Sequence, residues 1–358
     1  MKRAFLLLFL LLFFALPASA AEDIGIDTDV LEQELPAEAS ELMPELSPQE
    51  EPDLWIGAKS VILRAIAKTD GSLQSGLRLC AVLIGLVTLC SVADMSSVSK
   101  FGGAVSAAGA LGICAAFVGE FHAMVTMAQE TIQSLSGYSA CLLPVLASAA
   151  AMSGNLNAAA ALHAGTLLFS QLLMQLICKL LIPGVFFYLA VATAEAALSS
   201  DALKELRELI GWLISKSLRI MVYVFLAFLS VTGVIGGAAD AVAVKTTKAA
   251  MSGMVPVVGG MISDASETLI AGAAVIKNSI GVFGMIAVLS ICILPFLKVG
   301  IQYLLLKVTA AISGTVGLKP HISLLKNFST AMGYLLAMCG TCGLLLLVSC
   351  VCFIKVAV

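Results

Sequence analysis

The sequence predicts an all-α, polytopic membrane protein, and three observations lead to that fold class. Sixty per cent of the residues are hydrophobic, only 12% are charged and the mean hydropathy is +1.03, which excludes an ordinary soluble domain. Aromatic residues are scarce, whereas Ala, Gly and Ser, which let helices pack closely in a bilayer, are abundant. Apolar stretches long enough to cross a hydrocarbon core of about 30 Å recur along the chain. We expect about seven to ten hydrophobic segments, including proline-broken or re-entrant helices.

Residues 1–20 are typical of a signal peptide. Lys2 and Arg3 precede the short apolar stretch 4–16, and the small residues 18–20 fit a cleavage site. An uncleaved anchor is the alternative. In both cases the residues that follow are expected outside the cytoplasm.

Residues 21–53 form an acidic arm. The arm holds 12 Asp or Glu residues, no Lys or Arg, and four prolines, a composition that predicts disorder. Residues 54–358 have the opposite balance, with 18 basic and 11 acidic residues. Because Lys and Arg resist translocation while acidic residues hardly matter, an acidic arm suits the extracytoplasmic side. We expect a solvated tether, and a partner-docking segment is the alternative.

Residues 54–75 are expected to contain an amphipathic helix that lies at the membrane interface. Five apolar residues fall near one helical face, and three basic residues lie elsewhere around the helix. The apolar residues are Trp55, Ile56, Val61, Ile62 and Ile66, and the basic ones are Lys59, Arg64 and Lys68. The multi-span domain, residues 76–358, follows. Its first spans are expected at 77–93 and 102–128, and Gly103 and Ala107 have the spacing of close helix packing.

The later part of the chain carries the pattern of an internal duplication. Pro144 and Pro256 are 112 residues apart, as are Pro183 and Pro295. Two units, at about 137–237 and 249–353, would each contain a proline-bearing segment, a long apolar stretch broken by proline, a basic connector and a final span. Chance similarity between apolar sequences is the alternative.

The two basic connectors predict the orientation of these units. Lys204, Arg207, Lys216 and Arg219 belong to the first connector, and Lys307, Lys319 and Lys326 surround the second. Both are expected to face the cytoplasm, which would make the units run parallel to each other rather than inverted.

The residues present do not indicate catalysis. The three histidines are far apart, and no phosphate-binding loop or nucleophile elbow is found. The ten cysteines fall in apolar runs, where cysteine behaves as a small hydrophobe. Cys339 and Cys342 have the C-x-x-C spacing without the surroundings of a redox or metal site. We therefore expect no enzyme, no cofactor, no metal site and no nucleic-acid partner.

A few ionisable residues fall within apolar runs. Glu120 and Lys179 are the candidate intramembrane charges, and they are hypothesised to pair across helices. His122 and Glu195 are expected near a membrane boundary. Since a charge at the centre of a bilayer costs about 2.5–3.5 kcal/mol, each should face protein or water or lie near an interface. A polar pathway is one interpretation, and a boundary position, where Lys snorkels and Glu meets water, is the other.

The stretch 245–268 is the densest polar interruption of the apolar body, and it is the candidate polar pathway or partner-docking site. Its candidate residues are Lys245, Thr246, Thr247, Lys248, Pro256, Gly259, Gly260, Asp264 and Glu267. Proline removes a backbone donor and the glycine pair permits unusual backbone shapes. Since polar groups at membrane depth need protein or water around them, we interpret the stretch as a re-entrant hairpin or a docking surface. A polar interfacial loop between two spans is the alternative.

The same stretch, with its Val-Pro-Val-Val-Gly-Gly core, closely resembles a segment of the stage III sporulation protein AE family. The order of signal, acidic arm and apolar body is similar over nearly the full length. The resemblance implies the multi-span component of a channel or secretion-like complex between mother cell and forespore, needed for forespore development and late forespore gene expression. It implies residence in the mother-cell membrane around the forespore. The partners it implies are other stage III sporulation membrane proteins and the lipid bilayer, and it transfers no catalytic residues.

Two other classes of function compete with a complex component. The duplication and the proline-bearing helices would also suit a stand-alone secondary transporter or permease that uses intramembrane polar residues. The third class is a membrane scaffold with no pathway of its own. Flux through the purified chain would favour the transporter, whereas co-purification with other sporulation membrane proteins would favour the complex component.

Overall fold

The computed structural model describes residues 29–43, 54–96, 102–152, 156–254 and 258–355. In its two longest helices, side chains are described up to Leu229 and again from Asn278. The elements are α2 (Asp29–Gln33), α3 (Ala37–Ser40), α4 (Leu54–Ala67), α5 (Asp70–Ser96), α6 (Gly102–Met152), α7 (Leu156–Leu176), the π-helical turn η1 (Ile177–Leu181), α8 (Ile182–Leu198), α9 (Asp201–Met254), α10 (Val258–Ser313) and α11 (Lys319–Lys355). No strand occurs within these ranges.

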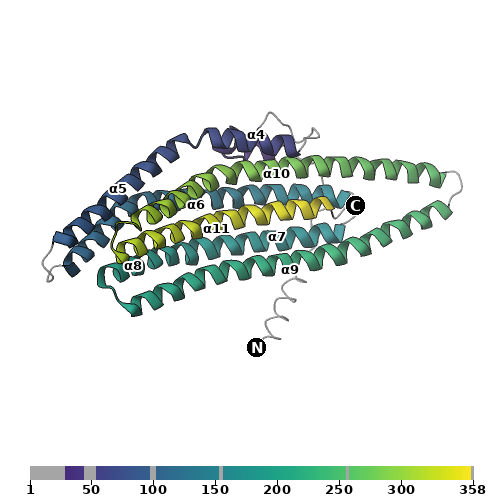
Figure 1. Cartoon of the computed structure of the whole chain (residues 1–358). Coiled ribbons are helices and arrows are strands. Elements are labelled where there is room, and N and C mark those ends of the chain that lie inside the picture. The colour runs from purple at the N-terminus through teal and green to yellow at the C-terminus, as the bar shows by residue number, and fades with distance from the viewer. Residues whose placement is uncertain (1–28, 44–53, 97–101, 153–155, 255–257, 356–358) are drawn as a thin grey trace.

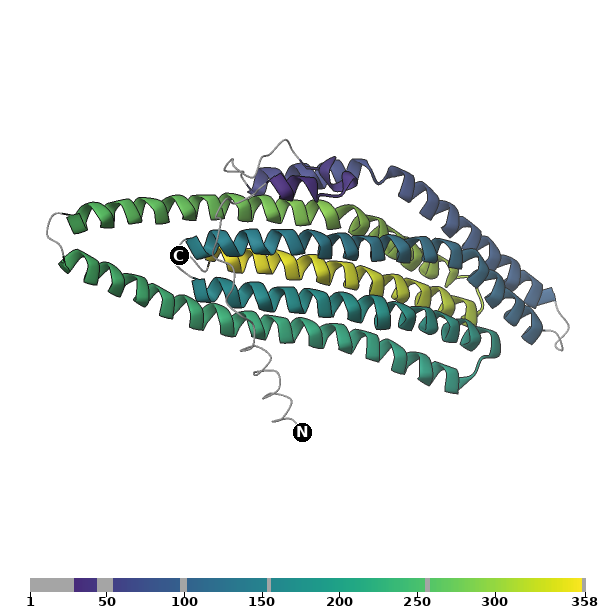
Figure 2. The same ribbon diagram turned by 180° about the vertical axis from the view of Figure 1, so that it is seen from behind.

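Long helices lie side by side in one bundle, and α9 and α10 continue well past its end as a hairpin (Figures 1 and 2). Within the residues whose side chains are described, six helices are long and apolar enough to cross a membrane, namely Asp70–Met95, Gly103–Ala151, Ala159–Leu198, Asp201–Leu229, Asn278–Ser313 and Lys319–Ile354. The prediction of an all-α, multi-span protein is confirmed. The estimate of about seven to ten hydrophobic segments is approximate, since one helix of 49 residues, Gly103–Ala151, covers apolar stretches that read as separate segments.

The later parts of the two expected units form two helical hairpins, while the internal duplication stays a prediction. In the first, α7, η1 and α8 run into a short turn and α9 returns; in the second, α10 runs into a turn and α11 returns. The two turns lie at the same end of the bundle, opposite the tip of the α9–α10 hairpin (Figure 1). The hairpins therefore have the same direction, as the two basic connectors predict.

Each turn is closed by backbone hydrogen bonds. In the first, Ser199 adopts a left-handed conformation with φ of 49°, and its N–H donates to the carbonyl of Glu195 at 2.8 Å. In the second, the N–H of Gly317 donates to the carbonyl of Ser313 at 2.8 Å. Such bonds satisfy the carbonyls that a helix leaves free at its C-terminus.

Proline-broken helices were expected, but the helices continue through the prolines. Pro295 lies inside α10, and Pro144 lies inside α6. Pro183 stands in the first turn of α8, directly after η1. A proline inside a helix lacks an N–H donor, and its ring clashes with the carbonyl one turn earlier. A π-helical turn relieves that clash, because the wider turn shifts this carbonyl away from the ring. The chain thereby continues along one axis through Pro183.

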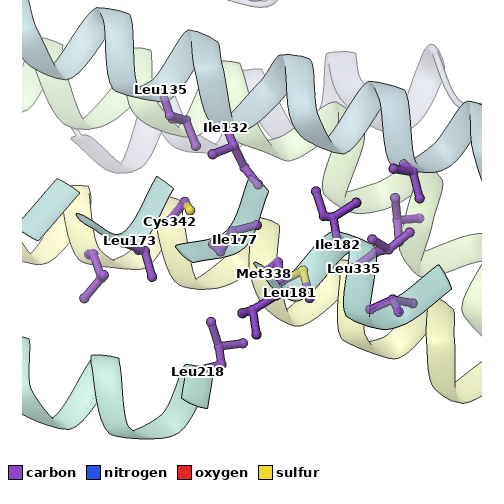
Figure 3. Close-up of a cluster of buried hydrophobic side chains, with 14 of the residues drawn as sticks. Ile132, Leu135, Leu173, Ile177, Leu181, Ile182, Leu218, Leu335, Met338 and Cys342 are labelled. Carbon is purple, nitrogen blue, oxygen red and sulfur yellow. The ribbon is translucent and has the colours of Figure 1, made fainter. Parts of the chain in front are cut away.

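The core of the bundle is made of side chains that several helices contribute at the same level. Figure 3 shows Ile132 and Leu135 of α6 facing Leu173, Ile177 and Cys342 of three other elements. Aromatic contacts continue this core, since the ring of Phe117 stacks on that of Phe328 with centroids 4.1 Å apart. Among the six candidate spans, the one in α10 has the largest buried share, 67%.

Part of the acidic arm is ordered, so the prediction of disorder is wrong for residues 29–43. Leu31 and Leu42 are fully buried against the bundle. The guanidinium of Arg64 donates to the carbonyl of Met43 at 2.5 Å, and Lys68 forms an ion pair with Glu41. Sparse leucines therefore provide the apolar contact, and basic residues of the α4 region offset the acidic charge. Residues 21–28 and 44–53 lie outside the described ranges.

The amphipathic helix predicted after the arm is present as α4. Its buried side consists of Gly57, Val61 and Ala65, which pack against α10. Trp55 is 77% exposed and Ile56 is 66% exposed. Val61 was expected on the membrane-facing side and instead packs in the protein, while the neighbouring apolar residues face outward. The position of α4 at a membrane interface stays a prediction.

Candidate polar sites in the helical bundle

The polar stretch 245–268 lies at the tip of the α9–α10 hairpin (Figure 2). Lys245, Thr246, Thr247 and Lys248 belong to the last turns of α9, and Gly259, Gly260, Asp264 and Glu267 belong to the first turns of α10. Pro256 falls in residues 255–257, outside the described ranges. The backbone is thus helical up to Met254 and again from Val258. A long polar loop over 245–268 was one of the expectations, and the described parts of this stretch are helical instead. The roles proposed for these side chains stay predictions.

The two candidate intramembrane charges do not meet. No ion pair links Glu120 and Lys179, both of which the structure describes. The ammonium of Lys179 is exposed on η1 and donates to the side-chain carbonyl of Gln175 at 3.4 Å. The hypothesis that they pair across helices is therefore wrong. An exposed lysine on a helix can reach toward an interface with its flexible stem.

A part-buried ion pair is instead formed by Glu195 and Arg207, which flank the turn between α8 and α9. The guanidinium Nε of Arg207 lies 2.6 Å from a carboxylate oxygen of Glu195, and the two side chains are only 14% and 15% exposed. The turn brings residues 12 positions apart into contact because it reverses the chain within two residues. Sequence reasoning assigned Glu195 to a membrane boundary and Arg207 to a connector. The close sequence spacing across an expected helix reversal was the signal that could have paired them.

The ion pair is part of a larger polar cluster that joins the two hairpins. The hydroxyl of Tyr188 in α8 donates to the side-chain carbonyl of Asn327 in α11 at 3.2 Å, in a buried position. Tyr188 also lies beside Arg207, and its ring meets that of Tyr334 edge-on, with centroids 5.5 Å apart. Gly211 of α9 leaves room for the Tyr334 hydroxyl, which would stand 2.6 Å from a Cβ at that position. Four side chains from three helices thus fix the relative positions of the hairpins.

A second polar site lies in the middle of the bundle. A cavity of about 20 Å³ is lined by residues of α6, α7, α9 and α11, and four of these residues carry hydroxyls: Ser136, Thr166, Ser170 and Ser349. The hydroxyl of Thr166 is buried and has no hydrogen-bond partner among the described residues. A space of this size holds about one water molecule. The cavity can therefore hydrate an otherwise unsatisfied hydroxyl, but it is too small to form a passage.

The described cysteines and histidines form no metal centre, since no group of three metal-ligating side chains gathers in the described ranges. Cys339 and Cys342 are both buried, and they and the other eight cysteines are free thiols. His321 is fully buried and its Nε2 lies 3.0 Å from the backbone oxygen of Ser106. This histidine is a packed core residue that ties α11 to α6.

Most of the chain matches one known protein family. The sequence profile of stage III sporulation protein AE matches residues 52–357, from the start of α4 to the end of α11. The chain belongs to the stage III sporulation protein AE family. The matched range includes all six candidate membrane spans and excludes the acidic arm except for its last two residues.

A curated member of the family gives the same assignment. The stage III sporulation protein AE of Bacillus subtilis (strain 168) is 27% identical to this chain over 217 residues, which cover 61% of this chain and 54% of the relative. The chain thus matches about half of the relative's length. No solved structure matches the chain. The family assignment makes this chain a sporulation membrane protein.

Proposed function

We propose that this protein is the multi-span component of a channel or secretion-like complex between mother cell and forespore. It would reside in the mother-cell membrane around the forespore and be needed for forespore development and late forespore gene expression. The family assignment supports the sporulation role, and the six apolar helices support the membrane location. We propose a structural rather than enzymatic role, in which other stage III sporulation membrane proteins are the partners.

The observation that carries this proposal is the long α9–α10 hairpin. Helix α9 begins at Asp201 at one end of the bundle and continues past the opposite end, and α10 returns from Val258. Both arms of the hairpin therefore extend past the neighbouring helices (Figure 1). An arm of this kind is well suited to contact another subunit.

The basic residues of the two connectors support one orientation, whereas Lys245 and Lys248 near the hairpin tip argue against translocation of the tip. Lys204 and Lys319 lie at the two connectors, which share one end of the bundle. The positive-inside rule places that end in the cytoplasm. With six crossings, the N-terminal arm, the hairpin tip and the end of α11 then lie together on the opposite side. This agrees with the predicted signal peptide, which would deliver the arm to that side.

Affinity purification of the tagged full-length chain from sporulating cells tests the proposal. A tip variant, Lys245→Ala with Lys248→Ala, is compared with a connector variant, Lys204→Ala with Lys319→Ala, which has the same change of charge. We expect the tip variant to accumulate normally, lose its co-purifying sporulation membrane proteins and arrest spore formation, while the connector variant keeps its partners. Retention of every partner by the tip variant would contradict the docking role.

The stand-alone transporter is separated by a second measurement. The purified chain in liposomes is expected to give no ion or solute flux above that of empty liposomes. A flux carried by this chain alone, and lowered by Glu120→Gln, would overturn the proposal in favour of the transporter.

A further inference from the structure

A groove of about 550 Å³ opens between α10 and α11, beside the polar cluster that joins the hairpins. Its polar lining residues are Tyr303, Lys307, Lys326, Ser329, Thr330 and Tyr334. Two alanines and Gly333 complete the lining, and small residues there keep the groove open. A Cβ at Gly333 would lie 3.3 Å from the Tyr303 ring, so the groove has little spare room at that point.

The groove carries two positive charges that the protein does not neutralise. Neither Lys307 nor Lys326 forms an ion pair within the described part of the chain, and no acidic residue lines the groove. The ammonium of Lys307 donates to the hydroxyl of Tyr303 at 3.0 Å and lies 5.3 Å from the centroid of that ring. One of its three donors is thus used within the protein, and the other two remain for a ligand. Lys326 is exposed on the facing helix.

The surface next to the groove is apolar. On α10, Leu304, Val308 and Ile312 are 59%, 55% and 50% exposed and follow one another at single-turn spacing. This row is offset by one residue from Tyr303 and Lys307, so it flanks the groove on the outer face of α10. In a membrane-spanning helix, such a row contacts acyl chains. A ligand that carries both an anion and an acyl chain would therefore satisfy both surfaces at once.

We infer that the α10–α11 groove binds the phosphate-bearing headgroup of an anionic membrane lipid, with an acyl chain along the Leu304–Ile312 row. The two ammonium groups supply both the charge and the hydrogen-bond donors for the phosphate, since the hydroxyls of Ser329 and Thr330 donate to the backbone carbonyls of Tyr303 and Lys326. Basic pockets between membrane helices near the cytoplasmic side have this chemistry. By binding across α10 and α11, the lipid would hold these two helices together. Since α10 also extends to the proposed docking tip, the lipid would stabilise the base of that hairpin arm. The inference does not depend on the identity of the partner proteins.

Native mass spectrometry of the full-length chain tests the inference. The protein is released from mixed micelles that contain phosphatidylglycerol and phosphatidylcholine in equal amounts, and the retained lipid is counted. We expect Lys307→Gln with Lys326→Gln to lower the preference for phosphatidylglycerol by about 30-fold, since each basic residue near a membrane surface contributes a free energy worth several-fold in affinity. The matched control is Lys204→Gln with Lys319→Gln, which removes equal charge outside the groove and is expected to leave the preference unchanged.

Two further measurements decide where the anion binds and whether it belongs to a lipid or to a soluble phosphate. Ala311→Phe leaves the charge unchanged and fills the mouth of the groove, so it is expected to lower phosphatidylglycerol retention as well. Soluble glycerol phosphate at millimolar concentration is expected not to displace the lipid, because it lacks the acyl chain. Equal losses in the groove and control variants, full retention in Ala311→Phe, or displacement by glycerol phosphate would each overturn the assignment of a lipid site in this groove.

Discussion

Glu195 and Arg207 form an ion pair across the turn between α8 and α9, with only about one seventh of each side chain exposed. The pair stands where the first hairpin reverses and where Tyr188 connects α8 to α11 through Asn327. A charge that is mostly removed from solvent is stabilised by such a partner, because solvent replaces the lost contact only in part. The cluster around this pair is therefore expected to fix how the two hairpins meet.

Removal of one partner of this ion pair should destabilise the bundle. Arg207→Gln leaves the part-buried Glu195 carboxylate without its counter-charge, and the expected loss is about 1–3 kcal/mol in the free energy of unfolding. Thermal unfolding of the detergent-solubilised protein measures the effect. The double variant Glu195→Gln with Arg207→Gln is expected to recover much of the loss. A double variant as unstable as the single one would show that the charges are not coupled.

The hydrogen bond between the hairpins can be tested separately. Tyr188→Phe removes the donor to Asn327 and leaves a buried amide oxygen unsatisfied, which should cost about 1–3 kcal/mol. Tyr223→Phe, at an exposed position on α9, makes the same chemical change and serves as the control. Chemical unfolding in mixed micelles should separate the two variants, and equal stability would argue against the bond.

Close packing of α6 depends on one particular glycine. A Cβ at Gly109 would lie 2.6 Å from the sulfur of Cys90 and 2.7 Å from the ring of His321, whereas a Cβ at Gly112 meets nothing within 4 Å. His321 cannot move freely, because it is buried and held by the backbone oxygen of Ser106. We expect Gly109→Ala to destabilise the protein by about 1–3 kcal/mol. Gly112→Ala should be neutral or stabilise by up to about 1 kcal/mol, since alanine favours helix more than glycine. Indistinguishable melting temperatures would refute the packing argument.

Docking of the acidic arm should depend on pH. The ammonium of Lys68 beside Glu41 lowers the pKa of that carboxyl below its ordinary value of 4.5. A lowered pKa in the folded state means that the contact stabilises docking above about pH 4.5 and is lost as the pH falls through the lower, folded-state value. The distribution of distances between spin labels at Ser40 and Lys59 should broaden as the pH falls through the folded-state pKa of Glu41. Glu41→Gln should abolish the pH response, and Glu38→Gln should leave it intact; a response unchanged by Glu41→Gln would assign it to another group.

Patterns in the sequence predicted the fold class and the direction of the two hairpins well. The fold class follows from composition, and the direction follows from the basic connectors and the paired proline spacing, because hydropathy and charge act over long stretches. The ordered arm was missed because its acidic residues dominate the composition, whereas Leu31 and Leu42 alone make the buried contact. Isolated apolar residues of this kind are visible only once the surface that receives them is known.

The candidate site was harder to predict. The pairing of Glu195 with Arg207 depends on where the turn falls, which shifts with each residue of helix length. The pairing of Glu120 with Lys179 rested on charge alone, and in the structure the exposed Lys179 ammonium instead donates to Gln175 on its own helical segment. The stretch 245–268 drew attention through its polarity, and its place at the tip of a hairpin depends on the length of α9, which composition does not reveal.

The most direct test of the central claim is a map of the two ends of the bundle in intact cells. Topology reporters inserted after Ser200, after Thr315 and between residues 255 and 257 report the side on which each point lies. We predict that both connectors report the cytoplasm and that the hairpin tip reports the opposite side of the membrane. A tip on the same side as the connectors would contradict the six-span arrangement and the proposed role of the hairpin in reaching partner proteins.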